Sequence, residues 1–192
     1  LHRGKQAHAD AASAVQRARI RAPHRADLPR IEALDRQAAG QEDEAHQLVL
    51  DSLKRFPQDV VLHLIAAEGW AARGRRKETL SHLDQAISSK PREYVARSRR
   101  ADFYMQSRRL EEAAADLAVM HSVNPTHVKG RLQTARLAML RDEHMPALQL
   151  LDALIAEEGT LQDSNLGHAL LYRAELHGKQ GNVHQEWADL TS

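Results

Sequence analysis

Cysteine is absent from the 192-residue chain, which excludes disulfides, thiol nucleophiles and cysteine-ligated zinc. Aromatic residues are also scarce, at 4% of the sequence, so a core must be built from Ala, Leu, Val and Ile. A β-sandwich or β-barrel would need more β-branched and aromatic residues than this. No apolar run reaches the roughly 18 residues that a membrane-spanning helix requires, and no signal peptide is visible. The composition therefore favours closely packed α-helices.

Motifs that carry catalytic chemistry are missing as well. The sequence has no Walker motif, no G-x-G-x-x-G loop and no serine-centred elbow. It has 12 histidines, but no two of them lie one helical turn apart, as paired metal ligands on one helix would. Neighbouring acids such as Glu111 and Glu112 point in different directions on a helix and cannot share a substrate. We therefore expect a protein that is not an enzyme and needs no cofactor or metal ion.

The net charge is only +1, which argues against nucleic-acid binding by bulk electrostatics. Charge is uneven along the chain: residues 1–30 hold seven Lys and Arg against two acids, and residues 142–192 hold two against nine. Basic clusters such as residues 97–100 (RSRR) are interrupted by acids and lack interleaved aromatic residues that would stack on bases. We expect a protein or peptide partner and no nucleic acid.

A spacing of 34 residues recurs along the chain. It separates each of four prolines from the next. A fixed period of this kind is typical of a solenoid, in which each repeat is one supersecondary unit. Positions with this spacing are small (Ala33, Ala67, Ala101, Ala135), small or Thr (Ala11, Ala45, Thr79, Ala113, Ala147), apolar (Val15, Val49, Leu83, Leu117, Leu151) or helix-ending (Pro23, Pro57, Pro91, Pro125).

Each period contains two predicted helices. In the period that starts at residue 60, residues 60–73 and 77–90 have the apolar spacing of helices and are separated by a turn at Gly74. Pro91 ends the second helix because proline cannot extend it. The turn position holds Gly40 and Gly74 in the first two periods, and Arg108 and Asp142 in the next two. Glycine, which favours a turn, is thus replaced toward the C-terminus.

These positions resemble the signature of the tetratricopeptide repeat family. The likeness rests on the small residue of the first helix, the turn glycine, the small and apolar positions of the second helix, and the closing proline. An aromatic residue stands at the family's place on the first helix twice, as Trp70 and Tyr104. The resemblance implies an all-α fold, a right-handed α-α superhelix (solenoid) of stacked antiparallel helix pairs with a 34-residue period. The chain departs from the family at a position that is usually large or aromatic, where it has Pro29, His63, Arg97 and Arg131.

The repeat register divides the chain into units. We expect both ends to expose a repeat face, because terminal repeats normally need a polar cap, and we expect self-association through them. Asp163, Ser164 and Asn165 offer helix caps in an insertion before the last unit. The predicted units are a lone second helix at 1–24, repeats at 26–59, 60–93, 94–127 and 128–159, a loop insertion at 160–166, and a partial last repeat at 167–192.

The resemblance also implies a concave groove lined by the first helix of each pair, where the family binds peptides. Acids in the middle (Glu68, Asp102) and bases further along (Lys129, Arg136) would suit a partner with basic residues against the middle and acids toward the C-terminal end. Leu132, His168 and Leu171 belong to the same row. The partner-binding residues predicted for this groove are Arg30, Leu34, Leu64, Glu68, Ser98, Asp102, Met105, Lys129, Arg136, Met139 and Glu175.

One subgroup of the family grips a partner's C-terminal carboxylates with Lys and Asn pairs on successive first helices. Those positions hold Leu64 with Glu68, and Ser98 with Asp102. An acid where the clamp needs Lys or Asn would repel a carboxylate, so binding of that kind is disfavoured.

The sequence favours a protein–protein interaction scaffold that binds a partner segment in its groove. Two alternatives stay open: the repeat region of a bacterial exopolysaccharide-export or secretion assembly, and a non-catalytic solenoid fused to an enzyme domain. The chain begins at Leu1 and ends at Ser192 within a helical pattern, so we expect a piece of a longer protein. We expect it to be soluble, and the compartment stays open between cytoplasm and periplasm.

Overall fold

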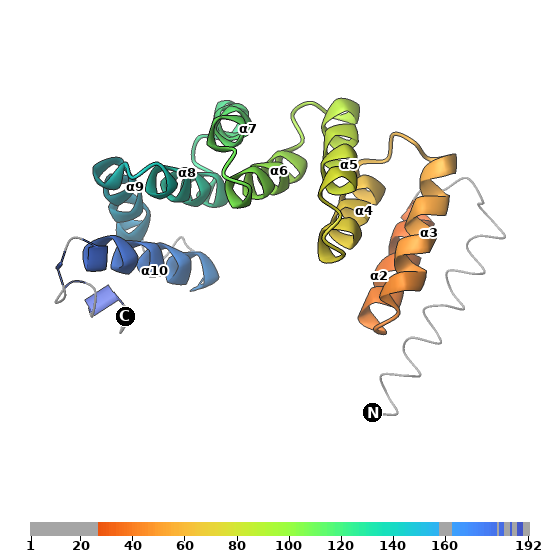
Figure 1. Ribbon diagram of the computed structural model, residues 1–192, viewed down its shortest axis with the longest axis horizontal. Coiled ribbons are helices and arrows are strands. Elements are labelled where there is room, and N and C mark those ends of the chain that lie inside the picture. Colours follow the sequence, from red (N-terminus) through yellow and green to blue (C-terminus); the bar gives the residue numbers. More distant parts are fainter. Residues whose placement is uncertain (1–26, 158–162, 180, 183–184, 186–187, 190–192) are drawn as a thin grey trace. The chain divides into compact units, whose positions relative to one another are not determined.

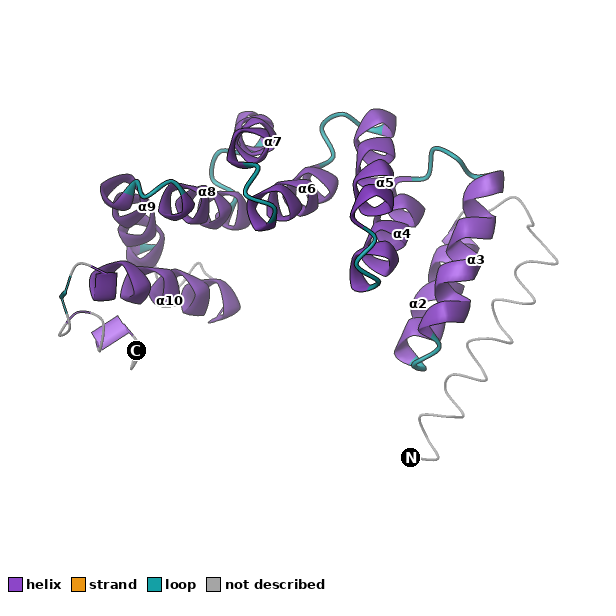
Figure 2. Ribbon diagram, viewed as in Figure 1, coloured by secondary structure: helices purple, strands orange, loops and turns teal. Residues whose placement is uncertain are grey.

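The computed structural model describes residues 27–157 and 163–179, together with residues 181, 182, 185, 188 and 189. Helices joined by short turns make up these residues, which contain no strand (Figure 2). The expectation of an all-α chain of helix pairs is confirmed, and the predicted lone helix at 1–24 lies outside the described residues. The helices labelled in Figure 1 are α2 (Asp27–Ala38), α3 (Glu42–Arg55), α4 (Val60–Ala72), α5 (Arg76–Ser89), α6 (Tyr94–Gln106), α7 (Leu110–Val123), α8 (Val128–Leu140), α9 (His144–Ala156) and α10 (Asp163–Lys179).

The chain divides into two compact units, Leu1–Ala96 and Arg97–Ser192. In the first unit α2 packs on α3, α3 on α4, and α4 on α5. In the second unit α7 packs on α8, α8 on α9, and α9 on α10, and α8 also contacts α10. Within each unit the contacts thus join neighbours along the chain or the first helices of successive pairs, as in a repeat solenoid.

Small buried residues allow the paired helices to lie close together. Ala33 on α2 and Ala45 on α3 are fully buried, and so are Ala135 on α8 and Ala147 on α9. A larger side chain at either position of a pair would push the two helices apart. Leucine, valine and isoleucine side chains fill the space around these contacts, chiefly Val49, Leu62 and Ile65 in one cluster and Leu151, Leu154 and Leu176 in another.

The turn within each pair has one residue in the left-handed region of backbone space. Gly40 and Gly74 have φ of 76° and 68° there, which glycine adopts without a steric penalty. Arg108 and Asp142 have the same conformation, with φ of 57° and 60°, although each carries a Cβ. A side chain in this conformation costs about 1 kcal/mol. The turn is therefore retained in the second unit even where the sequence has lost the glycine.

Helix α10 begins earlier than the sequence suggests. We predict a loop over 160–166 and a helix from 167, but α10 runs from Asp163 to Lys179. Acidic and small polar residues are favoured in the first turn of a helix as well as before it, because they interact well with its N-terminal dipole and exposed N–H groups. The residues expected to cap the helix therefore form the first turn of α10, so Asn165 lies on the helix.

Candidate functional site

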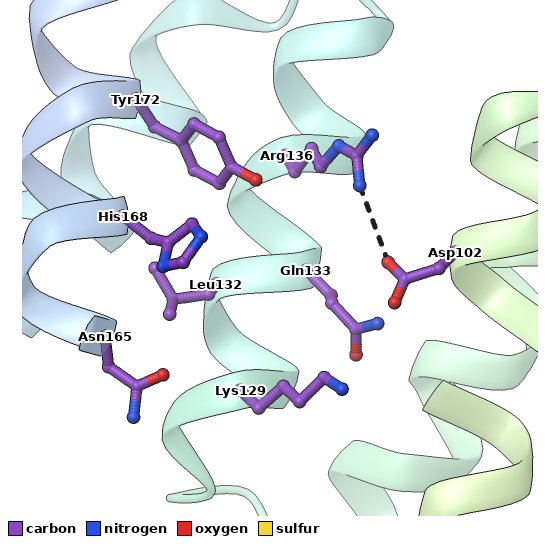
Figure 3. Close-up of a pocket in the computed structure, with 8 residues that line it drawn as sticks. All are labelled: Asp102, Lys129, Leu132, Gln133, Arg136, Asn165, His168 and Tyr172. Atoms are coloured by element: carbon purple, nitrogen blue, oxygen red, sulfur yellow. Dashed lines mark ion pairs between the residues drawn. The ribbon is translucent and has the colours of Figure 1, made fainter. Parts of the chain in front are cut away.

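The second unit has an open pocket of about 360 Å³ on the first helices of three successive pairs (Figure 3). Its walls come from α6, α8 and α10, and their side chains converge on one space. Helix periodicity explains the convergence: the α8 residues are spaced i, i+3, i+4, i+7, and the α10 residues i, i+3, i+7, so each set shares one helix face. The lining residues are Asp102 from α6, Lys129, Leu132, Gln133 and Arg136 from α8, and Asn165, His168 and Tyr172 from α10.

A buried polar contact holds α8 against α6 beneath the pocket. The Gln133 side-chain amide donates to the backbone carbonyl of Ser98 at 2.9 Å, and the Ser98 hydroxyl donates to Gln133 Oε1 at 3.1 Å. Both side chains are nearly inaccessible to solvent. Because a buried amide is costly to leave unpaired, this reciprocal pair fixes the rotamer of Gln133 and the relative position of the two helices.

The charges of the pocket are only partly compensated. Arg136 Nη1 lies 3.6 Å from Asp102 Oδ1, and about a third of each side chain is exposed. Lys129 is exposed and forms neither a hydrogen bond nor an ion pair with any residue that the structure describes. The wall also has an aromatic element, because the His168 and Tyr172 rings lie edge to face at 6.3 Å. The pocket therefore combines one uncompensated cation with apolar and amide surface.

Three of the predicted groove residues, Asp102, Lys129 and Arg136, lie together in this pocket. From the sequence, we expect Asp102 and Arg136 to contact different parts of a partner. In the structure the two side chains form an ion pair with each other. Glu175 is exposed on α10 but does not line the pocket, and its carboxylate pairs with Lys179 at 2.8 Å.

Several other predicted groove residues are buried. Ser98 is the partner of Gln133, and Met105 on α6 is only 2% exposed. Met139 packs in the core cluster around α8, α9 and α10, and Leu64 packs in a cluster of the first unit. These four side chains support the helix walls, and we leave them out of the proposed site.

In the first unit, Arg30 has a structural role. Its guanidinium bonds both carboxylate oxygens of Asp59, with Nε at 3.0 and 3.1 Å. Asp59 caps α4 by accepting from the Leu62 N–H at 2.9 Å, so Arg30 ties α2 to the start of α4. Leu34 and Glu68 are both exposed.

Three lining residues, Gln133, Asn165 and Tyr172, are not in the predicted groove row. Gln133 and Tyr172 each follow a row member by one residue or one helical turn, so the helical spacing around Leu132 and His168 could have indicated them. The assignment of 160–166 to a loop hides Asn165. Leu132 and His168 belong to the predicted row and line the pocket.

A pair of histidines joins α4 to α5. Because the two residues lie on different helices, a search for histidines one turn apart on one helix does not find them. His63 Nδ1 lies 3.0 Å from His82 Nδ1, and His63 Nε2 lies 3.0 Å from the Pro57 carbonyl. A carbonyl only accepts, so Nε2 of His63 carries a proton and donates to Pro57. Burial, and after it the neighbouring His63 and His46, lower the pKa of His82 to about 4. His82 is thus neutral at pH 7.

The second unit uses buried ions in the corresponding place. Asp116 on α7 is almost fully buried and accepts from Arg97 Nη1 and Arg100 Nε of α6, both at 2.7 Å. Opposite charges with direct hydrogen bonds compensate the burial of this carboxylate. Among the described residues, no group of three or more His, Asp or Glu side chains could hold a metal ion.

We compared the chain with protein families, with curated proteins and with solved structures. No protein-family model matches the sequence, and no curated protein matches it. Solved structures do match. A tetratricopeptide repeat protein from Parabacteroides merdae has a TM-score of 0.80 at 20% identity, over 96% of this chain and 72% of that one. A thermophilic repeat protein of Thermus thermophilus has a TM-score of 0.68 at 22% identity, over 86% and 88%.

A third structure, PilW, is titled a widely conserved type IV pilus biogenesis factor. Its TM-score is 0.77 at 18% identity, over 96% of this chain and 84% of that one. The protein therefore has the tetratricopeptide repeat fold, a solenoid of stacked antiparallel helix pairs. Of its described helices, none is both long enough and apolar enough to cross a lipid bilayer.

Proposed function

We propose that this chain is a scaffold that binds an extended segment of a partner protein along the α6–α8–α10 wall of its second unit. The observation that carries the proposal is the open pocket to which three successive first helices each contribute side chains. A segment that crosses three helices contacts all of them at once. Such contacts give a linear peptide both register and affinity without any chemical step.

The composition of the pocket supports a peptide ligand. Leu132 and the ring of Tyr172 offer apolar contact, and Asn165 adds an amide group, while the Gln133 amide is bonded to Ser98. Binding energy at interfaces is concentrated in such aromatic anchors with polar surroundings. A protein of the same fold, Cut9, has been solved in an assembly with Hcn1, at 12% identity and a TM-score of 0.79, over 96% of this chain and 36% of Cut9. Export or secretion assemblies and enzyme fusions are contexts in which the same docking role would serve.

Selection from a random peptide library displayed on phage, with the full chain as bait, tests the proposal. Peptides that are enriched are then titrated against the wild-type chain, Tyr172→Ala and Met145→Ala by calorimetry. Met145 is the control because it is a large apolar side chain that is 63% exposed and lies on α9 outside the pocket. We expect Tyr172→Ala to weaken binding about tenfold or more and Met145→Ala to leave it within about twofold. Peptides equally sensitive to both variants, or to neither, would contradict the proposal.

A further inference from the structure

We infer that the end of the pocket formed by Lys129 and Asn165 binds the side-chain carboxylate of a single Asp or Glu within the partner segment. The inference rests on the proposed function and specifies the chemistry that the segment must carry. It concerns an internal acidic residue, and the residues that hold it differ from the Lys and Asn pairs that grip a C-terminus in one subgroup of the fold.

The two cations of α8 act at different ends of the pocket. Lys129 and Arg136 are seven residues apart on one helix, which places their backbones about 10 Å from each other along its axis. Figure 3 shows Arg136 directed toward Asp102 at one end, while Lys129 and Asn165 lie toward the other. The two cationic groups are thus directed to different ends of the pocket. Arg136 already faces an acid, and Lys129 is the cation left to bind an added anion.

Lys129 and Asn165 provide a matched set of donors. Neither side chain makes a hydrogen bond or ion pair within the described part of the chain, and both line the same pocket. The ammonium group supplies three N–H donors and the Asn165 amide two. A carboxylate accepts from either group, and a charge-assisted bond to the ammonium group is stronger than a bond between neutral groups. Leu132, which lies next to His168 in the same pocket, would offer apolar contact to the rest of the segment (Figure 3).

Asp102 restricts the pocket to one acid. Its carboxylate lies at the Arg136 end, and Arg136 at 3.6 Å compensates it only in part. A dianionic phosphate, or a second acidic residue directed to that end, would be repelled by Asp102. We therefore expect a segment with one acidic residue at the Lys129 end and uncharged residues toward the Arg136 end.

The test uses an enriched library peptide and the same peptide with its acid changed to the amide, Glu→Gln or Asp→Asn. Both are titrated against the wild-type chain, Lys129→Glu and the control Lys77→Glu. Lys77 is an exposed lysine of α5 in the first unit, so its variant makes the same charge change away from the pocket. We expect the peptide's amide form and Lys129→Glu each to lose about tenfold in affinity, with Lys77→Glu unchanged. A peptide with Lys in place of the acid should regain affinity for Lys129→Glu.

Two results would overturn the inference and leave the proposed function standing. One is an enriched peptide that depends on Tyr172 but binds its amide form and Lys129→Glu as well as the originals. The other is tighter binding of a phosphorylated peptide than of the acidic one. Failure to enrich any peptide, or binding that is indifferent to Tyr172, would overturn the proposed function and this inference together. Asp102→Asn should change the affinity in the opposite direction to Lys129→Glu. Because it removes a repelling carboxylate, it should raise the affinity for acidic peptides severalfold.

Discussion

The helix pairs α4–α5 and α6–α7 are each joined through equivalent positions, but with different chemistry. His63 and Arg97 stand one repeat period apart, as do their partners His82 and Asp116. The first pair of helices has two imidazole rings in contact at 3.0 Å, and the second has a buried carboxylate between two guanidinium groups at 2.7 Å. The helix pairing therefore does not depend on one particular polar contact. The contact instead decides how each repeat responds to mutation and to acid.

The surface contacts of an arginine near the turn are the same in both helix pairs. Arg75 lies over the Trp70 ring at 5.9 Å, and Arg109, at the same position of the next repeat, lies over the Tyr104 ring at 4.5 Å. Each of these arginines also bonds a glutamate three residues on, Glu78 or Glu112. Exposed contacts of this kind contribute little. Small buried residues and the left-handed turn, which both of these pairs share, set the spacing between the helices.

The largest effect should come from breaking the buried ions. Asp116→Ala removes the carboxylate to which Arg97 and Arg100, only 14% and 18% exposed, both donate. We expect a loss of about 3–5 kcal/mol in the free energy of unfolding, measured with denaturant. Glu111→Ala is the control, since Glu111 is 86% exposed and pairs with Arg141 at the surface. It should cost at most about 1 kcal/mol. Equal effects of the two substitutions would show that the Asp116 contact is not structural.

A second difference lies at Gly69 and Phe103, which occupy equivalent positions of the two repeats. A Cβ added to Gly69 would lie 2.2 Å from Nδ1 of the buried His46, which contacts Trp70 edge to face at 4.6 Å. Gly69→Ala should therefore lower the free energy of unfolding by about 1–3 kcal/mol through overpacking. Gly167→Ala in α10 meets no atom within 4 Å and should raise it by about 0.5–1 kcal/mol. Thermal melting of both variants checks the contrast, and stabilisation by Gly69→Ala would contradict it.

Acid should distinguish the two repeats. The pKa of His82 is lower in the folded chain, at about 4, than its ordinary value of 6.5, so the unfolded chain takes up a proton first. Stability is therefore complete above about pH 6.5 and falls as the pH drops toward 4. After allowance for solvent screening of this half-buried ring, the loss is on the order of 1–2 kcal/mol.

His82→Leu isolates this pH effect. Leucine stands at the corresponding position one period earlier, Leu48, and two periods later, Leu150, so the fold accepts it there. Denaturant unfolding at pH 7 and pH 5 should show a smaller pH difference for His82→Leu than for the wild-type chain. An identical pH difference would mean that other groups carry the acid sensitivity.

The smallest effect concerns the turns. Arg108 has the left-handed conformation that Gly74 adopts in the preceding repeat. Arg108→Gly should raise the free energy of unfolding by about 0.5–1 kcal/mol, because glycine removes the steric penalty. Gly74→Ala is the reverse test and should lower it by about 1 kcal/mol. A melting temperature that falls in Arg108→Gly would show that the arginine's surface contacts outweigh the turn.

The fold could be predicted because its determinants are local and repeated. The small residue at Ala33 and its counterparts, the turn residue and the closing proline recur in one register, and each acts within its own helix pair. The site could be predicted only in part. Asp102, Lys129 and Arg136 followed from the register, but the burial of Met105 and Met139 did not. First helices pack against both their own partner and the next pair, so a shift of one residue moves a side chain from groove to core.

Nuclear magnetic resonance titration of the ¹⁵N-labelled full chain with an enriched peptide tests the central claim most directly. We predict that the shifted signals are the backbone amides of α6, α8 and α10 around the pocket and the side-chain amide of Asn165. Shifts confined to α2–α5, or spread evenly over both units, would contradict a binding site on this wall.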